Sequence, residues 1–219
     1  MLCGNAISFC HCQLQILRLT RSRFSDDGFK QLTEALKKDT ELEELGLVAQ
    51  DIDADRARWL SFVVAKSPNL RVLRLERNDL DDNATSILCT GLARSHIQTL
   101  VLDDNKISDS GAKALAAVIA RGNLQSLSLT NNKIKAIGAS ALATALKSPR
   151  SRVTELSLAG NNIPRAGGEE LKLALEEVET IVKFDMRQNW FSPATMGQIK
   201  KIMKDRRTNK KDTSDKIKR

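Results

Sequence analysis

A short cluster near the amino terminus, Cys10-His11-Cys12, carries side chains that can bind a metal ion. Thiolate and imidazole are the donors that zinc prefers, and Cys3 would supply a fourth ligand. The spacing differs, however, from the Cys-x2-Cys pairs of zinc knuckles. We therefore favour a lead-in segment or partial cap over residues 1–13, or the end of a helix that lies against the first strand, without a metal.

Three carboxylates, Asp103, Asp104 and Asp109, lie close enough in sequence to suggest a cation site. The alternative, which we favour, is an acidic edge that faces solvent. The two histidines of the chain, His11 and His96, have no nucleophile or carboxylate at a telling spacing, and no Gly-rich phosphate loop occurs. We therefore predict a protein that is not an enzyme and that needs no cofactor and no metal.

Most of the chain is built from one recurring pattern of eleven residues. In Leu124–Ile134 (LQSLSLTNNKI), apolar residues stand first, fourth, sixth and eleventh, and Asn132 stands ninth. Seven copies begin at steps of 28, 28, 27, 27, 29 and 28 residues: Leu14–Phe24, Leu42–Ile52, Leu70–Leu80, Ile97–Ile107, Leu124–Ile134, Val153–Ile163 and Ile181–Phe191. A near-fixed period of this length predicts a solenoid in which each repeat stacks on its neighbours.

Each copy predicts a short strand followed by a polar turn. Leu127 and Leu129 alternate with polar residues, so one face of the strand is apolar. Burying each leucine contributes about 1.5–3 kcal/mol. The ninth position, which we call the ladder position, is Asn in five copies: Asn78, Asn105, Asn132, Asn161 and Asn189. An amide donates and accepts, so we expect these residues to bond unpaired backbone groups rather than a ligand. Ser22 and Gln50 occupy this position in the first two repeats, which predicts a looser amino-terminal end.

A helix is expected after every turn. Ten and fourteen residues beyond the ladder position stand apolar pairs that share one helix face: Leu32/Leu36, Leu60/Val64, Leu88/Leu92, Leu115/Ile119, Leu142/Leu146, Leu171/Leu175 and Ile199/Met203. A glycine six residues beyond it in four repeats would let the helix pack close to the sheet. Ser192-Pro193 predicts the start of the last helix.

These residues resemble the leucine-rich repeat family, in its long, ribonuclease-inhibitor-like class. The resemblance covers nearly the whole chain, and seven registers of the motif agree. It implies an α/β fold, a horseshoe-shaped solenoid of about seven repeats with an inner parallel sheet and outer helices. We place the repeat domain at residues 14–204. The resemblance also implies a non-enzymatic module that presents its concave surface to a protein partner.

The side chains that point outward from the strands are the expected contact surface, which we call the sheet surface. Its middle is small and polar, and it lacks the aromatic anchors that binding hot spots favour. We expect the partner contact to centre on charged and hydroxyl side chains of the middle repeats: Arg74, Glu76, Arg77, Asp103, Asp104, Ser128 and Thr130. The alternative is that these residues are solvated on an unused face. We expect Trp190 to pack against the last repeat.

The positive charge is concentrated at the carboxyl end. From Lys200 to Arg219 there are ten Lys or Arg and three Asp, a balance of +7 that leaves +1 of the net +8 for the rest of the chain. Residues 205–219 lack core residues, so we expect a basic, disordered tail, helical at most at its start. The tail is a candidate contact for import factors, nucleic acid or acidic surfaces, or it only solubilises the protein.

The four cysteines follow no repeat spacing, and no secretory signal precedes them, so we expect a reduced thiol state and a cytoplasmic location, with the nucleus as the alternative. No apolar run is long enough to predict a transmembrane segment.

Two other functions stay open. The repeats resemble those of the Ran GTPase-activating protein, which implies a regulator of a small GTPase with Arg74 or Arg77 beside Asn78 as the acting residues, although that family has an acidic carboxyl-terminal region where this chain is basic. They also resemble the repeats of innate-immune sensors, of which this chain would be a fragment. Actin capping of the tropomodulin type would be a variant of the interaction module.

Overall fold

Seven strands and seven helices alternate along the chain in the computed structural model, which describes residues 14–38 and 41–217, the last nine of these for their backbone alone. The strands are β1 (Ile16–Thr20), β2 (Glu44–Val48), β3 (Val72–Arg74), β4 (Thr99–Val101), β5 (Ser126–Ser128), β6 (Glu155–Ser157) and β7 (Lys183–Asp185). The helices are α1 (Asp26–Leu36), α2 (Ala54–Lys66), α3 (Asp82–Leu92), α4 (Asp109–Ile119), α5 (Ala136–Leu146), α6 (Arg165–Glu177) and α7 (Pro193–Ile217).

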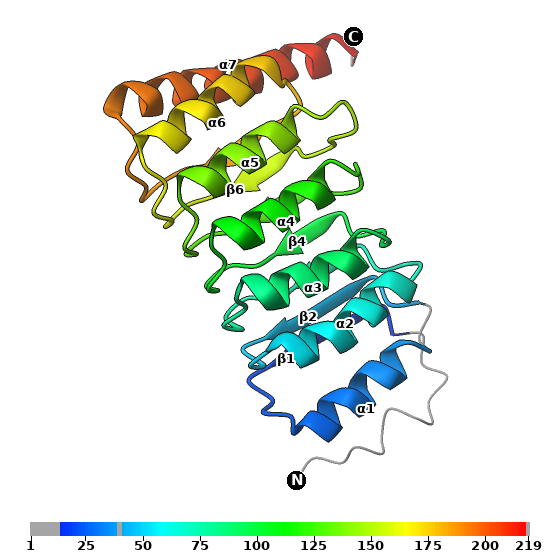
Figure 1. The fold of residues 1–219 in the computed structure, drawn as a ribbon. Coiled ribbons are helices and arrows are strands. Elements are labelled where there is room, and N and C mark those ends of the chain that lie inside the picture. Colours follow the sequence, from blue (N-terminus) through cyan, green and yellow to red (C-terminus); the bar gives the residue numbers. More distant parts are fainter. Residues whose placement is uncertain (1–13, 39–40, 218–219) are drawn as a thin grey trace.

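The strands form one parallel sheet in the order β1 to β7, and the helices stack in a row along one of its faces (Figure 1). Adjacent strands pair in the register that the repeat period predicts, for example Leu73 with Leu100 and Leu100 with Leu127. The sheet is open, with β1 and β7 at its edges. The prediction of an α/β solenoid of about seven repeats is confirmed.

The core is a continuous strip between the sheet and the helices. The repeated apolar positions fill it, and Leu73, Leu100 and Ile134 have no exposed surface. The first strand is different, because Leu17 and Leu19 are only half-buried while their neighbours Leu45 and Leu47 are fully covered.

The last helix departs from the expected boundary of the repeat domain. Helix α7 continues past Lys204 to Ile217, through most of the segment for which we expected disorder. It begins as predicted, because the Ser192 hydroxyl accepts a hydrogen bond from the Thr195 N–H at 3.0 Å. The Arg206 guanidinium donates to the carbonyls of Leu175 and Ile181 and so ties the middle of α7 to the last repeat.

Candidate functional site

The sheet surface lies opposite the helices, so no other element of the described chain covers it (Figure 1). Side chains alternate along each strand, and the outward ones are half-buried where the inward leucines are buried. All seven residues predicted for the partner contact lie on this surface or on the turn that follows the strands. The structure brings them together in three groups.

Asp103 is the centre of the first group. Its Oδ1 accepts hydrogen bonds from the Ser128 hydroxyl at 2.5 Å and from the Thr130 N–H at 2.8 Å. The Thr130 hydroxyl in turn lies 2.8 Å from the Ser157 hydroxyl of the next repeat. Asp103 is therefore held by the neighbouring repeat and orders the polar middle of the sheet surface.

The second group forms a row on the turns after β3, β4 and β5. The Arg77 guanidinium lies 3.3 Å from an Asp104 carboxylate oxygen, and the other oxygen accepts from the Asn131 amide at 2.8 Å. These three residues precede the ladder position and have φ between 54° and 59°, a left-handed conformation uncommon for residues other than glycine. Gly160 takes the same place in the next repeat, where a Cβ would lie 2.0 Å from the Asn131 Oδ1, so the row ends there.

The third group is an ion pair with an unused oxygen. The Arg74 guanidinium, at the end of β3, donates to the Oε1 of Glu76, two residues further along the chain, at 2.5 Å. The Glu76 Oε2 is buried and has no hydrogen-bond partner within the described residues. A buried acceptor without a partner is costly, and the burial of this atom keeps it out of reach of donors from outside the chain.

Charges at both ends of the sheet surface are also paired. The Arg18 guanidinium donates twice to the Glu44 carboxylate, at 2.7 and 2.9 Å, and this hydrogen bonding lowers the pKa of Glu44. At the other end, Lys183 lies 2.5 Å from Glu155, and Arg187 lowers the pKa of Asp185 by hydrogen bonding to it. The surface therefore presents neutralised ion pairs rather than a single sign of charge.

Asp109 lies apart from Asp103 and Asp104, so the three do not form the cation site considered above. Its Oδ1 accepts from the N–H groups of Lys135 and Gly138, both at 2.8 Å, at the start of helix α5. Within residues 14–38 and 41–217, no three His, Cys, Asp or Glu side chains group as metal ligands. Cys3 and the Cys10-His11-Cys12 cluster lie outside the described residues.

The contact of Asp109 with α5 is a capping device that the sequence analysis missed. Helices α4 and α5 have no side-chain hydrogen bond from their own N-cap residue. Asp82 of the preceding helix caps α4 instead, accepting from the N–H groups of Ser108 and Gly111 at 2.7 and 3.0 Å. The signal in the sequence is an Asp four residues after a ladder Asn, together with a glycine six residues after the ladder position of the next repeat. A Cβ on Gly111 would come within 2.7 Å of the Asp82 Oδ1, so glycine makes room for the capping carboxylate.

The ladder residues act structurally, as predicted. The Asn105 Oδ1 accepts from the N–H groups of Asn78 and Leu80, both at 3.0 Å, and its amide donates to the carbonyls of Leu75 and Leu102. Each ladder Asn thus joins its own turn to the preceding repeat. Gln50 does not continue the ladder, because its Oε1 is buried without a partner in the described chain.

The remaining candidates for chemistry are isolated. His96 is exposed in the loop before β4. Cys89 is buried and free, and burial raises the pKa of its thiol to about 12. Trp190 is 73% exposed, so the expectation that it packs against the last repeat is wrong.

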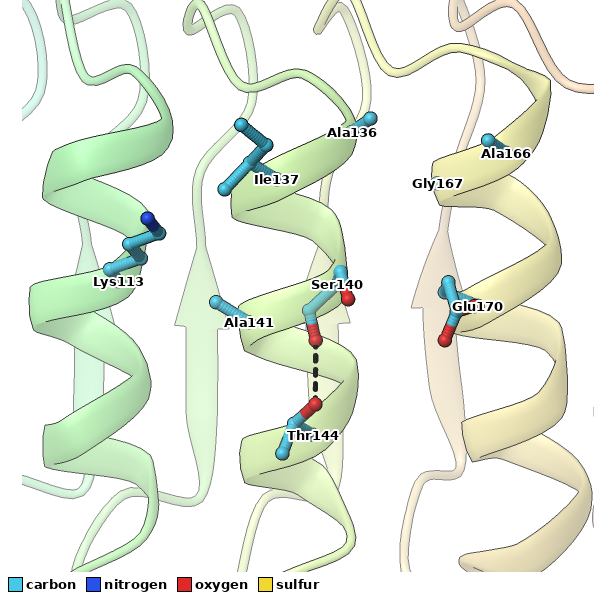
Figure 2. A pocket seen from close by; sticks show the side chains of 9 residues that line it. All are labelled: Lys113, Ala136, Ile137, Ser140, Ala141, Thr144, Ala166, Gly167 and Glu170. Atoms are coloured by element: carbon cyan, nitrogen blue, oxygen red, sulfur yellow. Dashed lines mark hydrogen bonds between the residues drawn. The ribbon is translucent and has the colours of Figure 1, made fainter.

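The outer face carries a shallow groove of about 460 Å³ over α4, α5 and α6. Figure 2 shows that small side chains line it, with Lys113 and Glu170 at its two sides and the Thr144 hydroxyl turned back onto the Ser140 carbonyl at 2.9 Å. Ile137, which also lines the groove, is 58% exposed. No reactive group converges here, so the groove has no catalytic character.

No helix in the described part of the chain is both long and apolar enough to cross a bilayer.

Comparisons with known proteins agree with the repeat architecture. The family model described as "Leucine Rich repeat" matches residues 66–84, 94–116 and 123–143. NACHT, LRR and PYD domains-containing protein 13 of Homo sapiens is 36% identical over 96 residues, which are 42% of this chain and 9% of that protein. The chain therefore corresponds to only a small part of that relative.

Solved structures share the fold at low identity. Leiomodin-1 actin-binding site 2 superposes with a TM-score of 0.54 at 16% identity, over 89% of this chain and 97% of that one. The Caenorhabditis elegans tropomodulin C-terminal domain gives a TM-score of 0.52 at 12% identity, over 85% and 96% of the two chains. The recurring leucine and asparagine positions, the parallel sheet backed by helices and these matches lead to one conclusion: the chain contains leucine-rich repeats and folds as a leucine-rich repeat solenoid.

Proposed function

We propose that this protein is a non-enzymatic interaction module that binds a protein partner on its sheet surface. The observation that supports this most is the ordered polar network of Asp103, Ser128 and Thr130, fixed before any partner arrives. Preorganised side chains lose little conformational entropy on binding.

Two substitutions in the middle of the sheet surface test this proposal without touching that network. Thr99 and Ser126 are register partners on β4 and β5, and neither side chain makes a hydrogen bond recorded for the described residues. Thr99→Arg with Ser126→Arg would fill the surface with bulk and charge. The matched control is Ala117→Arg with Thr144→Arg, which adds the same groups to exposed positions on α4 and α5.

The readout is quantitative affinity capture with wild type and both double variants, after circular dichroism has shown that all three are folded. We expect a set of proteins that the sheet-surface variant loses and the outer-face control retains. If instead the outer-face control loses the partners and the sheet-surface variant keeps them, the proposed function is placed on the wrong face.

A second candidate, a fragment of an innate-immune sensor, draws support from the 36% identity to a protein whose name includes NACHT and PYD domains. An antibody against the repeats distinguishes the two, since a stand-alone module gives a band at 24.2 kDa and a sensor fragment comes from a much larger protein. A cytoplasmic location, with the nucleus as the alternative, belongs to either proposal.

Regulation of a small GTPase gains no support from the geometry. Arg74 is bound to Glu76 and Arg77 to Asp104, and Asn78 is buried with its amide bonded to the Leu47 carbonyl at 2.6 Å. Actin capping rests on structures below 25% identity, which show the fold alone.

A further inference from the structure

The groove on the outer face has two different halves, one on each side of α5 (Figure 2). On the side toward α4, the Ile137 side chain projects from the surface as an apolar knob and is 58% exposed. On the side toward α6, the lining residues Ala136, Ala166 and Gly167 have little or no side chain and leave a hole. Ile137 and Ala166 each stand five residues after a ladder Asn, so the knob and the hole lie at the same level along the helices.

Two charged side chains flank the groove in the same way. Lys113 lies on α4 and Glu170 on α6, each on the side that faces α5 (Figure 2). Lys113 stands eight residues after Asn105 and Glu170 nine after Asn161, so their levels also match. Both are exposed, and neither side chain forms an ion pair with a residue that the structure describes. Packed helices lie about 8–10 Å apart, so α5 keeps these two charges too far apart to neutralise each other.

We propose that this face binds a second copy of the same chain, related by a two-fold axis that runs along α5. Such an axis preserves the level along the helices and exchanges the two sides of α5. It therefore places Ile137 of each copy in the hole beside Ala166 of the other, and Lys113 of each copy opposite Glu170 of the other. One symmetry operation satisfies both the apolar and the charged halves, as an isologous interface requires.

The charges select this axis and this occupant. An axis across the helices would lay α4 on α4, which has no exposed acidic residue to meet Lys113. A further apolar side chain fits the axis along α5, because Leu173 on α6, which is 43% exposed, would face Ala117 on α4 of the other copy. Both stand twelve residues after a ladder Asn. A helix of another protein would need a cation, an anion and apolar side chains in these places, and a second copy already has them.

The interface leaves the sheet surface of both copies uncovered, because that surface lies on the opposite side of the sheet from the helices (Figure 1). The dimer would therefore present two sheet surfaces that point away from each other. The inference does not rest on the proposed function. Ala117→Arg with Thr144→Arg, the outer-face control above, should be monomeric and still retain the partners of the sheet surface, so the failure of one proposal does not decide the other.

Sedimentation velocity of the full chain at concentrations up to about 100 μM, a range that covers weak interfaces, tests the proposal. The 24.2 kDa monomer should give way to a dimer as the concentration rises. Lys113→Glu and Glu170→Lys should each weaken the dimer roughly tenfold or more, because each replaces two attractions with two repulsions. An equimolar mixture of these two variants should dimerise about as tightly as wild type, because every cation then faces an anion again.

The apolar half needs its own variant. Ile137→Ala should weaken the dimer roughly tenfold or more, because two buried isoleucines are truncated. The matched control, Phe62→Ala, removes a side chain of similar exposure, 56%, from α2, and it should dimerise within about twofold of wild type.

Three results would overturn the proposal. The first is a wild type that stays monomeric over the whole range, which would leave the groove to a helix of another protein. The second is a mixture of the two charge variants that dimerises no more tightly than either variant alone. The third is an equal effect of Ile137→Ala and Phe62→Ala.

Discussion

Substitution of Asn161 by alanine tests the role of the ladder in a single position. Asn161 is 2% exposed, and its Oδ1 accepts from the Ile134 N–H at 3.0 Å. Its amide donates to the carbonyls of Leu129 at 2.8 Å, Leu158 at 3.0 Å and Ala159 at 3.3 Å. Alanine would remove all four hydrogen bonds and leave the backbone groups in the buried turn.

The cost follows from which of those groups keep another partner. The Leu158 carbonyl also accepts from the Asn189 amide and the Ala159 carbonyl from the Asn131 N–H, both at 2.8 Å, so these two carbonyls stay bonded. The Ile134 N–H and the Leu129 carbonyl have no replacement recorded among the described residues. Each buried unpaired group costs about 1–3 kcal/mol, so we expect the free energy of unfolding to fall by about 3 kcal/mol.

The measurement is unfolding by heat and by urea, followed by circular dichroism. For a chain of this size, about 3 kcal/mol lowers Tm by roughly 6–12 °C. The control is Asn162→Ala in the same turn, because Asn162 is exposed and its side chain makes no recorded hydrogen bond; it should change stability by less than about 0.5 kcal/mol. If Asn161→Ala costs no more than Asn162→Ala, the hydrogen bonds of the ladder do not stabilise the turns.

Three further substitutions or treatments follow from single contacts. Asp109→Ala removes the cap of α5 and should cost about 1–2 kcal/mol in urea unfolding, whereas Glu170→Ala on the exposed face of α6 should stay within about 0.5 kcal/mol; equal losses would contradict the cap. Cys89, whose pKa is about 12, should resist N-ethylmaleimide at pH 8 in the native protein and react in urea, as mass spectrometry of its peptide would show; rapid native labelling would contradict its burial. The lowered pKa of Glu44 stabilises the fold at neutral pH, and this contribution is lost as pH falls through that pKa, below the ordinary 4.5. The stability difference between wild type and Glu44→Gln, at most about 1 kcal/mol for an exposed pair, should therefore shrink below that pH; a constant difference from pH 7 to 3 would contradict it.

The repeat period predicted most of the fold because the period itself is a physical constraint. Leucines such as Leu73, Leu100 and Leu127 can share a core only if equal positions of successive repeats lie side by side, and the observed register has that arrangement. The length of α7 was not predictable in this way, because beyond Lys204 the apolar pattern that indicates a packed helix is absent.

The candidate site was predicted in its location but not in its contacts. Sequence spacing places Asp103 and Ser128 on adjacent strands, but it does not show that their side chains bond to each other. Whether they bond depends on their rotamers and on turn residues in the left-handed conformation, such as Asp104 with a φ of 55°. No residue type in the repeat motif predicts that conformation. Asp82 and Asp109 were missed for a similar reason, since they act on the helix of the next repeat rather than on their own.

Hydrogen–deuterium exchange of the protein with and without a captured partner tests the central claim, that the sheet surface is where a partner binds. The account predicts slower exchange in the segments 74–77, 103–104 and 128–130 on partner binding, with helices α3, α4 and α5 unchanged. Protection confined to those helices, with the strand and turn segments unaffected, would contradict it.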